Sequence, residues 1–101
     1  MDIGHAINII YEGLYGCDSI PVKLRSAKHL DMNRLNEVME ALNYTIDYYR
    51  DAEAVPKKLA LSLVDISSLF VFKEGYFDDE TLLNLENIGM ELQEKAYVLF
   101  S

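Results

Sequence analysis

The sequence predicts an all-α fold, a small helical bundle with either four long helices or four long helices and one short extra helix. Apolar residues recur at alternating spacings of three and four along several segments, which is the period of an amphipathic helix. No hairpin dipeptide separates two alternating runs, so strands have little support. Half of the 101 residues are apolar and only two are proline, a globular composition, so we expect residues 1–101 to form a single domain.

The chain opens with a predicted helix that has a regular apolar face. The residues of that face are Ile3, Ile7, Ile10 and Leu14. Gly16 is a typical C-terminal stop for this helix. In the connector that follows, Ser19 is a candidate N-cap and Pro21 suits a first helical turn. A short helix is therefore predicted over about 21–29.

The clearest amphipathic pattern predicts a helix that begins at Asp31, a good N-cap, and runs to about residue 52. The residues expected on its buried face are Met32, Leu35, Met39, Leu42, Ile46 and Tyr49. Because each residue turns a helix by about 100°, Tyr44 and Tyr48 fall on the opposite, outer side.

The segment from Pro56 to about residue 73 is predicted to be a fourth long helix. Its core face is expected to comprise Leu59, Leu63, Ile66 and Phe70. Its other side is not polar either, and carries Leu61, Val64, Ser68 and Phe72. A helix that is apolar nearly all round lies either at the centre of a bundle or in a subunit interface. The β-branched residues leave a strand open as an alternative, although the length and the spacing favour a helix.

The last helix is predicted over about 79–99. Gly75 is the expected stop before it, and Asp78 or Asp79 is the expected start. The residues predicted to be buried are Leu82, Leu85, Gly89, Leu92, Ala96 and Leu99.

The net charge narrows the class of partner. A formal charge of -8 on 101 residues repels nucleic acid and anionic membranes, and it speeds encounter with basic surfaces. The single cysteine, Cys17, cannot form an internal disulfide, which favours a reducing compartment. The first ten residues contain no Lys or Arg, and the longest apolar run, 59–72, is too short to span a membrane. We therefore expect a cytoplasmic protein that binds neither nucleic acid nor membrane.

Catalytic and metal-binding motifs are not apparent, so we expect neither an enzyme nor a cofactor. The histidines and the cysteine lack the short paired spacing of a zinc site. Two Glu-x-x-Glu pairs, Glu37 with Glu40 and Glu91 with Glu94, place two carboxylates on one helix face, where they could share a divalent ion. All-helical magnesium-dependent nucleotide pyrophosphohydrolases use such a pair, but with a second Glu-x-x-Asp motif that is missing here. Such an enzyme, acting through Glu37 and Glu40, is one alternative function.

A partner-binding surface is predicted on the outer side of the 31–52 helix. The acids that surround Tyr44 and Tyr48 there are Glu37, Glu40, Asp47 and Asp51. Tyrosine is enriched at binding hot spots, because its rigid ring buries a large area at low entropic cost. A second acidic region runs from 74 to 94 with seven acids and no Lys or Arg, and its candidate contact residues are Tyr76, Asp79 and Glu80.

An acidic helix with exposed tyrosines on a small cytoplasmic protein resembles the bacterial toxin immunity proteins, in particular those that neutralise nuclease colicins and the nuclease domains of contact-dependent growth inhibition toxins. In the DNase-colicin group, an adjacent Tyr-Tyr pair on a helix, flanked by acids, anchors the toxin. The similar residues here are Tyr48 and Tyr49, with Asp47 before them and Asp51 after. Arg50 stands where that group has Pro, and the periodicity turns Tyr49 inward, so the resemblance assigns an anchor role to Tyr48 alone.

The expected function is therefore that of an acidic binding protein that neutralises a basic protein partner, as an immunity protein blocks a nuclease toxin. The partner implied by the resemblance is a toxin nuclease domain. A second alternative is a homodimeric structural or adaptor subunit, in which Leu61, Val64 and Phe72 of the fourth helix form the dimer contact.

Overall fold

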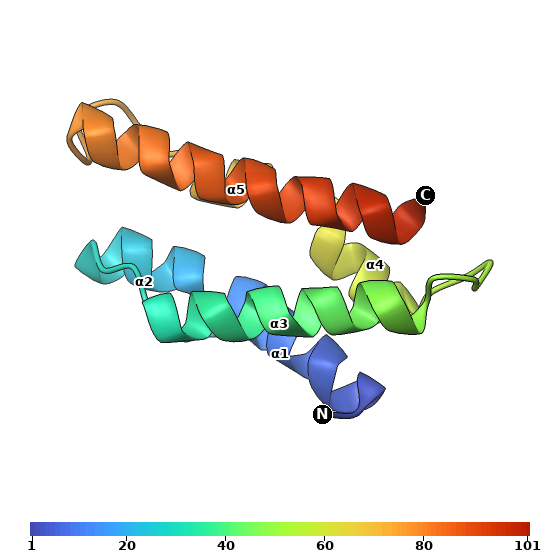
Figure 1. Ribbon diagram of the computed structural model, residues 1–101. Coiled ribbons are helices and arrows are strands. Elements are labelled where there is room, and N and C mark those ends of the chain that lie inside the picture. The colour runs from blue at the N-terminus through green and yellow to red at the C-terminus, as the bar shows by residue number, and fades with distance from the viewer.

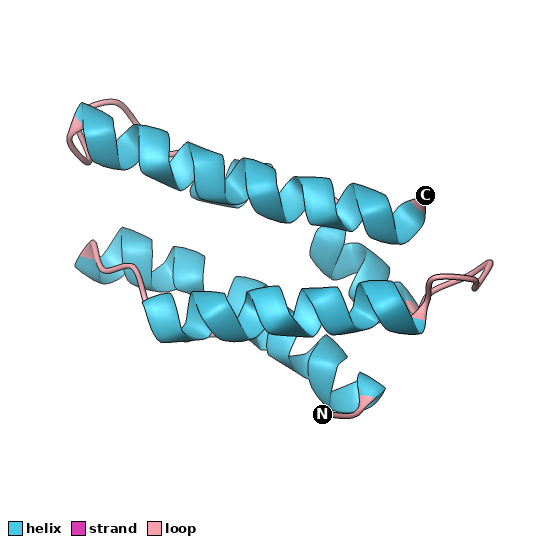
Figure 2. Cartoon of the chain, viewed as in Figure 1, coloured by secondary structure: helices cyan, strands magenta, loops and turns pink.

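Five α-helices and one 3-10 turn form the regular structure of the computed structural model, which describes all residues from 1 to 101 (Figure 1). In chain order they are α1 (Ile3–Tyr15), α2 (Ile20–Ala27), α3 (Met32–Tyr48), α4 (Lys57–Leu63), η1 (Ser67–Phe70) and α5 (Asp79–Phe100). There is no strand (Figure 2), so the predicted all-α bundle is confirmed and the strand alternative for the fourth segment is wrong.

The bundle is built along α3 and α5, which run in the same direction down the long axis of a molecule of 43 × 23 × 19 Å (Figure 1). α1 crosses behind α3 in this view. The segment from α4 to η1 carries the chain back towards the start of α5. α4 packs against α1, whereas η1 packs against α5. None of the helices combines the length and the apolar composition needed to cross a lipid bilayer.

Side-chain caps fix where four of the helices begin. The capping residues are Asp2, Ser19, Asp31 and Asp78, and each side chain accepts a hydrogen bond from the backbone N–H three residues later. This bond satisfies a donor that has no partner inside the helix. The predicted caps Ser19 and Asp31 are confirmed, and Asp78 is the cap of the last helix. Gly75 adopts a left-handed φ of 88° in the turn before it, as a glycine stop allows.

The buried face of α3 differs from the predicted one. The residues of α3 that are buried are Leu35, Val38, Ala41, Leu42 and Thr45. Met32 is exposed, and Met39, Ile46 and Tyr49 are only partly buried. The centre of the buried face is thus rotated by roughly 60° towards Val38, at about 100° per residue. The reason is that α3 has neighbours on two flanks, α1 and α5, rather than one core on one side.

The end of α3 is also earlier than predicted. The helix ends at Tyr48 instead of residue 52, with Tyr49 as its C-cap. Beyond it the chain tightens into turns, in which the N–H of Arg50 donates to the carbonyl of Asp47 and the N–H of Ala52 donates to the carbonyl of Tyr49. These shorter-range bonds replace the next helical turn.

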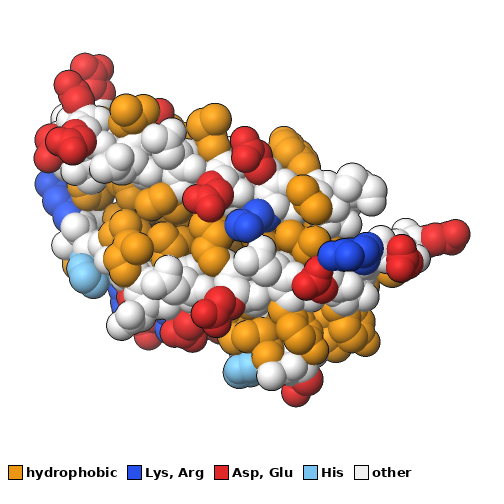
Figure 3. All heavy atoms as spheres, viewed as in Figure 1, with side chains coloured by type: hydrophobic (Ala, Val, Ile, Leu, Met, Phe, Trp, Pro, Cys, Tyr) orange, Lys and Arg blue, Asp and Glu red, His pale blue; other side chains and the backbone are white.

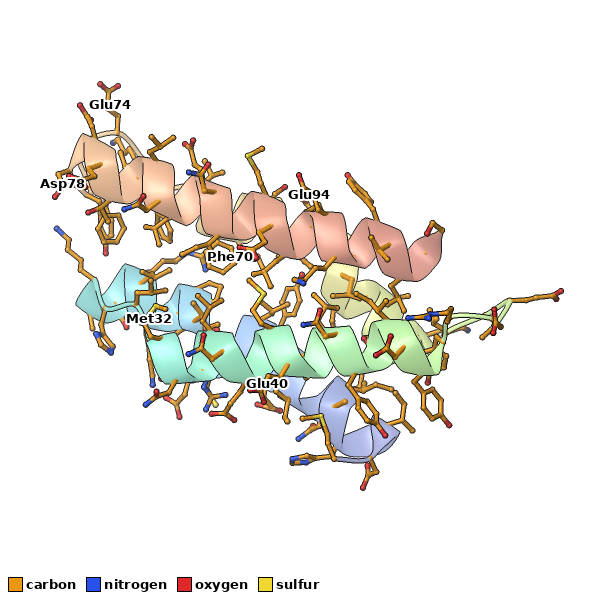
Figure 4. The ribbon with its side chains drawn as sticks, viewed as in Figure 1. Met32, Glu40, Phe70, Glu74, Asp78 and Glu94 are labelled. Carbon is orange, nitrogen blue, oxygen red and sulfur yellow. The ribbon has the colours of Figure 1, made fainter.

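The segment 56–73 is not one helix, and this corrects the prediction of four long helices. It divides into α4 and η1, separated by 64–66, and Val71 after η1 is extended. The predicted core residues of the segment, Leu59, Leu63, Ile66 and Phe70, are nevertheless all fully buried. Phe70 points into the space between α5 and α3 (Figure 4).

A glutamine of α5 holds the break between α4 and η1. The side-chain oxygen of Gln93 accepts from the backbone N–H groups of Ile66 at 2.9 Å and Ser67 at 3.2 Å, and its amide nitrogen donates to the carbonyl oxygen of Leu63 at 3.3 Å. Backbone groups that a continuous helix would pair internally are therefore paired by a neighbouring helix. Because of this break, α4 packs against α1 and η1 packs against α5.

The last helix agrees closely with its prediction. α5 runs from Asp79 to Phe100, and the residues of it that are buried are Leu85, Gly89, Leu92, Gln93, Ala96 and Leu99. Leu82 is only partly covered, and Gln93 is the one polar residue among them. The predicted short helix is also present as α2.

Candidate functional site

The predicted partner-binding residues of α3 form an acidic stripe along the outside of the helix. Glu37, Glu40 and Asp47 are exposed, as the spacing indicates. Asp51 is exposed too, but it lies in the turns after α3 rather than on the helix. We call Glu37, Glu40, Asp47 and Tyr48 the outer face of α3.

The two outer tyrosines of α3 have different surroundings. Tyr48 is 57% exposed, whereas Tyr44 is half-buried and packs against the core, so its predicted full exposure is wrong. The rotation of the buried face does not account for this difference, because its centre near Val38 lies closer to Tyr48 than to Tyr44 at about 100° per residue. Tyr48 is the last residue of α3, whereas Tyr44 lies one turn inside the helix. Spacing alone did not predict this rotation, because Val38, Ala41 and Thr45 lie outside the regular run of larger apolar residues on α3.

Tyr48 is held between two other rings. Its ring centroid lies 6.4 Å from that of Tyr44 in a stacked arrangement and 4.9 Å from that of Tyr49 in an edge-to-face arrangement. Burial, and secondarily the neighbouring Tyr48, raise the pKa of Tyr49 above its ordinary value. Tyr48 therefore presents to solvent an aromatic ring that two neighbouring rings hold in place.

The carboxylates of the outer face are not equally free. Asp47 accepts a hydrogen bond from the guanidinium of Arg50 at 2.6 Å, so part of its charge is already compensated. Glu37 lines a hollow of about 280 Å³ between α1, the turn after it and α3. The other residues around that hollow are Asn8, Ile9, Glu12, Cys17, Asp18 and Arg34. Sequence reasoning missed Glu12 and Asp18 as neighbours of Glu37, because only the crossing of α1 and α3 brings them together.

Metal-binding geometry is not found at these acids. No group of three or more His, Cys, Asp or Glu side chains gathers in a way that could hold a metal ion. The pair Glu37 and Glu40, and likewise Glu91 and Glu94, therefore have no third side-chain ligand. Two carboxylates on one exposed helix face are what a solvated surface also presents.

At the start of α5, the predicted contact residue Tyr76 is engaged within the chain. Its hydroxyl donates a hydrogen bond to the carbonyl oxygen of Arg25 in α2, and the ammonium group of Lys28 lies 4.6 Å from its ring centroid. Tyr76 thus fastens the loop before α5 to α2. Asp79 and Glu80 are exposed in the first turn of α5, where carboxylates stabilise the positive end of the helix dipole.

The solvent-facing side of α5 carries an apolar ridge that sequence reasoning missed. Leu83, Met90 and Tyr97 are all exposed and follow one another at intervals of seven residues. Glu86 and Glu94 flank them, and the nearby Lys95 is turned away to donate to Asn43 of α3 at 2.9 Å. The interval of seven was the available signal for this ridge.

The two acidic surfaces are separate. Glu40 lies on the side of α3 away from α5, and Glu94 lies on the side of α5 away from α3 (Figure 4). Over both helices, Asp and Glu side chains outnumber Lys and Arg in the space-filling view (Figure 3). A single partner surface would therefore meet one of these helices rather than both.

No protein-family model, curated protein or solved structure matches this chain.

Proposed function

We propose that this protein is an acidic cytoplasmic binding protein that neutralises a basic protein partner, and that it acts as an immunity protein against a nuclease-type toxin. The observation that carries the proposal is Tyr48, an exposed ring braced by Tyr44 and Tyr49 on a helix that bears Glu37 and Glu40. A ring that is already held in place loses little freedom on binding, which favours tight contact.

The charge of the chain supports the same partner chemistry. At -8, the protein attracts a basic nuclease domain over a distance and raises the association rate at low salt. Tyr48 would then slow dissociation by filling an apolar recess of the toxin, since aromatic anchors act mainly on the dissociation rate. Glu37 and Glu40 would meet Lys or Arg side chains that otherwise grip nucleic acid.

The proposal predicts that the gene of a large toxin lies directly upstream, because an immunity gene should follow its toxin gene, and the test uses the nuclease domain of that toxin. We expect the purified nuclease domain of that toxin to bind this protein, and Tyr48→Ala to weaken binding by about 30-fold or more, the loss typical of a buried aromatic anchor. Glu37→Gln should act chiefly on the association rate, and mainly at low salt. Binding kinetics measured at two salt concentrations separate these effects.

The control is the double variant Asp79→Asn with Glu80→Gln, which removes two exposed acids at the start of α5. It should leave affinity at high salt unchanged if the outer face of α3 is the docking surface. Loss of affinity in this variant, with none in a folded Tyr48→Ala, would move the site to α5. Nucleotide hydrolysis that disappears in Glu40→Gln would replace the whole proposal with a metal-dependent enzyme.

A further inference from the structure

The α1–α4 side of the molecule exposes apolar side chains that nothing in the chain covers. Leu61 is 70% exposed and Val64 is 69% exposed, the two highest values among the large hydrophobic residues after position 1. Tyr11 and Tyr15 of α1 are also exposed beside them, with ring centroids 6.1 Å apart. We call these four residues the α1–α4 patch. Contiguous apolar surface of this kind marks contact sites in small proteins.

The patch has a hollow next to a projection. Tyr11, Tyr15, Leu61 and Ser62 line a hollow of about 230 Å³. That volume is ample for one aliphatic side chain. Leu61, on the rim, is the most exposed of the large hydrophobic side chains. A surface that combines a hollow with an apolar projection can fit a copy of itself, as a two-fold interface requires.

Opposite charges lie at the two ends of the patch. The ammonium group of Lys58 lies 4.7 Å from the ring centroid of Tyr11. At the other end, the exposed Asp65 follows Lys58 by seven positions, just beyond the end of α4. Burial first, and the carboxylate of Asp65 second, raise the pKa of Tyr15. α1 and α4 therefore run in the same direction here, with a positive charge at the start of the patch and a negative charge at its end.

We propose that a second copy of this chain docks on the α1–α4 patch, across a two-fold axis that sets the two α4 helices antiparallel. Leu61 of each copy enters the hollow between Tyr11 and Tyr15 of the other. The same axis brings Lys58 of one copy to Asp65 of the other, twice. One positive and one negative charge give the patch no preference for acidic or basic partners in general. In the antiparallel arrangement, however, each charge faces its opposite in the second copy.

The charges also argue against the basic partner as the occupant of this patch. Lys57 and Lys58, both exposed, would repel a basic surface, whereas the outer face of α3 attracts one. For self-association these lysines are favourable, because they offset part of the repulsion between two chains that each carry a charge of -8. The inference does not depend on the proposed function, because it uses no residue of the outer face of α3.

The dimer is expected to be weak. A stable interface buries about 800 Å² on each partner, and four side chains, two from α1 and two at the end of α4, supply only part of that area. A dissociation constant on the order of 10–100 µM follows. Sedimentation equilibrium on the full chain, up to about 500 µM, should show a monomer that converts to a dimer.

Two sets of variants test the geometry. Leu61→Ser should raise the dissociation constant about tenfold or more, and Leu83→Ser, an equally simple change at an exposed leucine of α5, should leave it unchanged. Lys58→Glu and Asp65→Lys should each weaken the dimer about fivefold, because each places like charges across the axis. The double variant should restore the dissociation constant to within about twofold of that of the unaltered chain. Such a restoration requires that the two charges face each other across the interface.

A monomer at the highest concentration overturns the inference, as does a dimer that Leu83→Ser disrupts as much as Leu61→Ser. Failure of the double charge swap to restore association overturns the antiparallel arrangement. A monomer in which Leu61→Ser abolishes binding to the toxin nuclease domain would assign the patch to that partner instead.

Discussion

Two contacts between elements in this bundle are built around a glycine, and they differ in what the glycine admits. At Gly13 in α1, an added Cβ would overlap the side chain of Val38 in α3. At Gly89 in α5, an added Cβ would lie 3.0 Å from Cβ of Phe70 and 3.2 Å from the carbonyl oxygen of Ser67. The space left by the missing side chain of Gly13 is filled by a side chain of α3, whereas the space at Gly89 allows the backbone of η1 to come close.

The two partner segments also differ in their secondary structure. A side chain can enter a neighbour's gap while its own helix stays continuous, as Val38 does in α3. At Gly89 the close neighbour is the backbone of Ser67, which begins η1 just after the break that separates it from α4. The break then leaves donors and an acceptor without helical partners, and Gln93 supplies them from the same helix as Gly89.

The largest effect is expected for Gln93→Leu, which keeps the volume similar and removes every hydrogen bond to the break. The buried N–H of Ile66 and the carbonyl of Leu63 would then be unpaired, at about 1–3 kcal/mol each. We expect a loss of about 3–5 kcal/mol in the free energy of unfolding, measured by urea denaturation followed by circular dichroism. Glu94→Leu, the same product residue at the next, exposed position, is the control. A loss below about 1 kcal/mol for Gln93→Leu would show that the break does not depend on this side chain.

The two glycines should differ in whether a second substitution rescues them. Gly89→Ala should cost about 2–3 kcal/mol, because the backbone of Ser67 cannot be trimmed away. Gly13→Ala should cost at least as much, because its Cβ would overlap the side chain of Val38, which is fully buried and has one strongly preferred rotamer in a helix. Combining Gly13→Ala with Val38→Ala should cost at least about 1 kcal/mol less than the sum of the two single changes. Thermal unfolding of the three variants measures this coupling, and simple additivity would contradict the side-chain contact.

Much of the fold was predictable because its signals are local. The caps Ser19, Asp31 and Asp78 bond to groups three residues away, and apolar spacing identified the buried side of the segment that contains Leu59 and Phe70. The break in that segment was not predictable, because its cause, Gln93, lies 27 positions from Ile66 and carries no local mark.

The candidate site was predicted in outline for the same reason. The exposure of Tyr48 follows from its place on the helix, but the partial burial of Tyr44 depends on its packing against the core, which helical position alone does not predict. Likewise, the internal contacts of Tyr76 depend on α2 lying beside the loop before α5. Spacing reports which side of one helix is apolar, and it does not report which neighbours cover the flanks.

The smallest effect is expected at the N-terminal caps of α3 and α5, which are Asp31 and Asp78. Hydrogen bonds from the ammonium of Lys23 first, and from the N–H of Arg34 second, lower the pKa of Asp31 below its ordinary value of 3.8. For Asp78, the N–H of Thr81 is the main cause of a lowered pKa. A carboxyl group with a lowered folded-state pKa stabilises the fold above its ordinary pKa, and that stabilisation is lost as the pH falls through the lowered value.

Stability should therefore decrease as the pH falls below about 4, and the decrease should be shallower in Asp31→Asn and Asp78→Asn than in the unaltered chain. Asparagine is as good an N-cap as aspartate, so neither variant should lose its helix start at neutral pH. Asp31→Asn should show the larger change of slope, because the ion pair with Lys23, at 2.8 Å, ties α3 to α2, whereas Asp78 bonds only within its own helix. Urea denaturation at a series of pH values gives the slopes, with Asp79→Asn as the matched control because it removes a carboxylate but no cap. Equal slopes in Asp31→Asn and Asp79→Asn would mean that the contact between α2 and α3 does not depend on this charge.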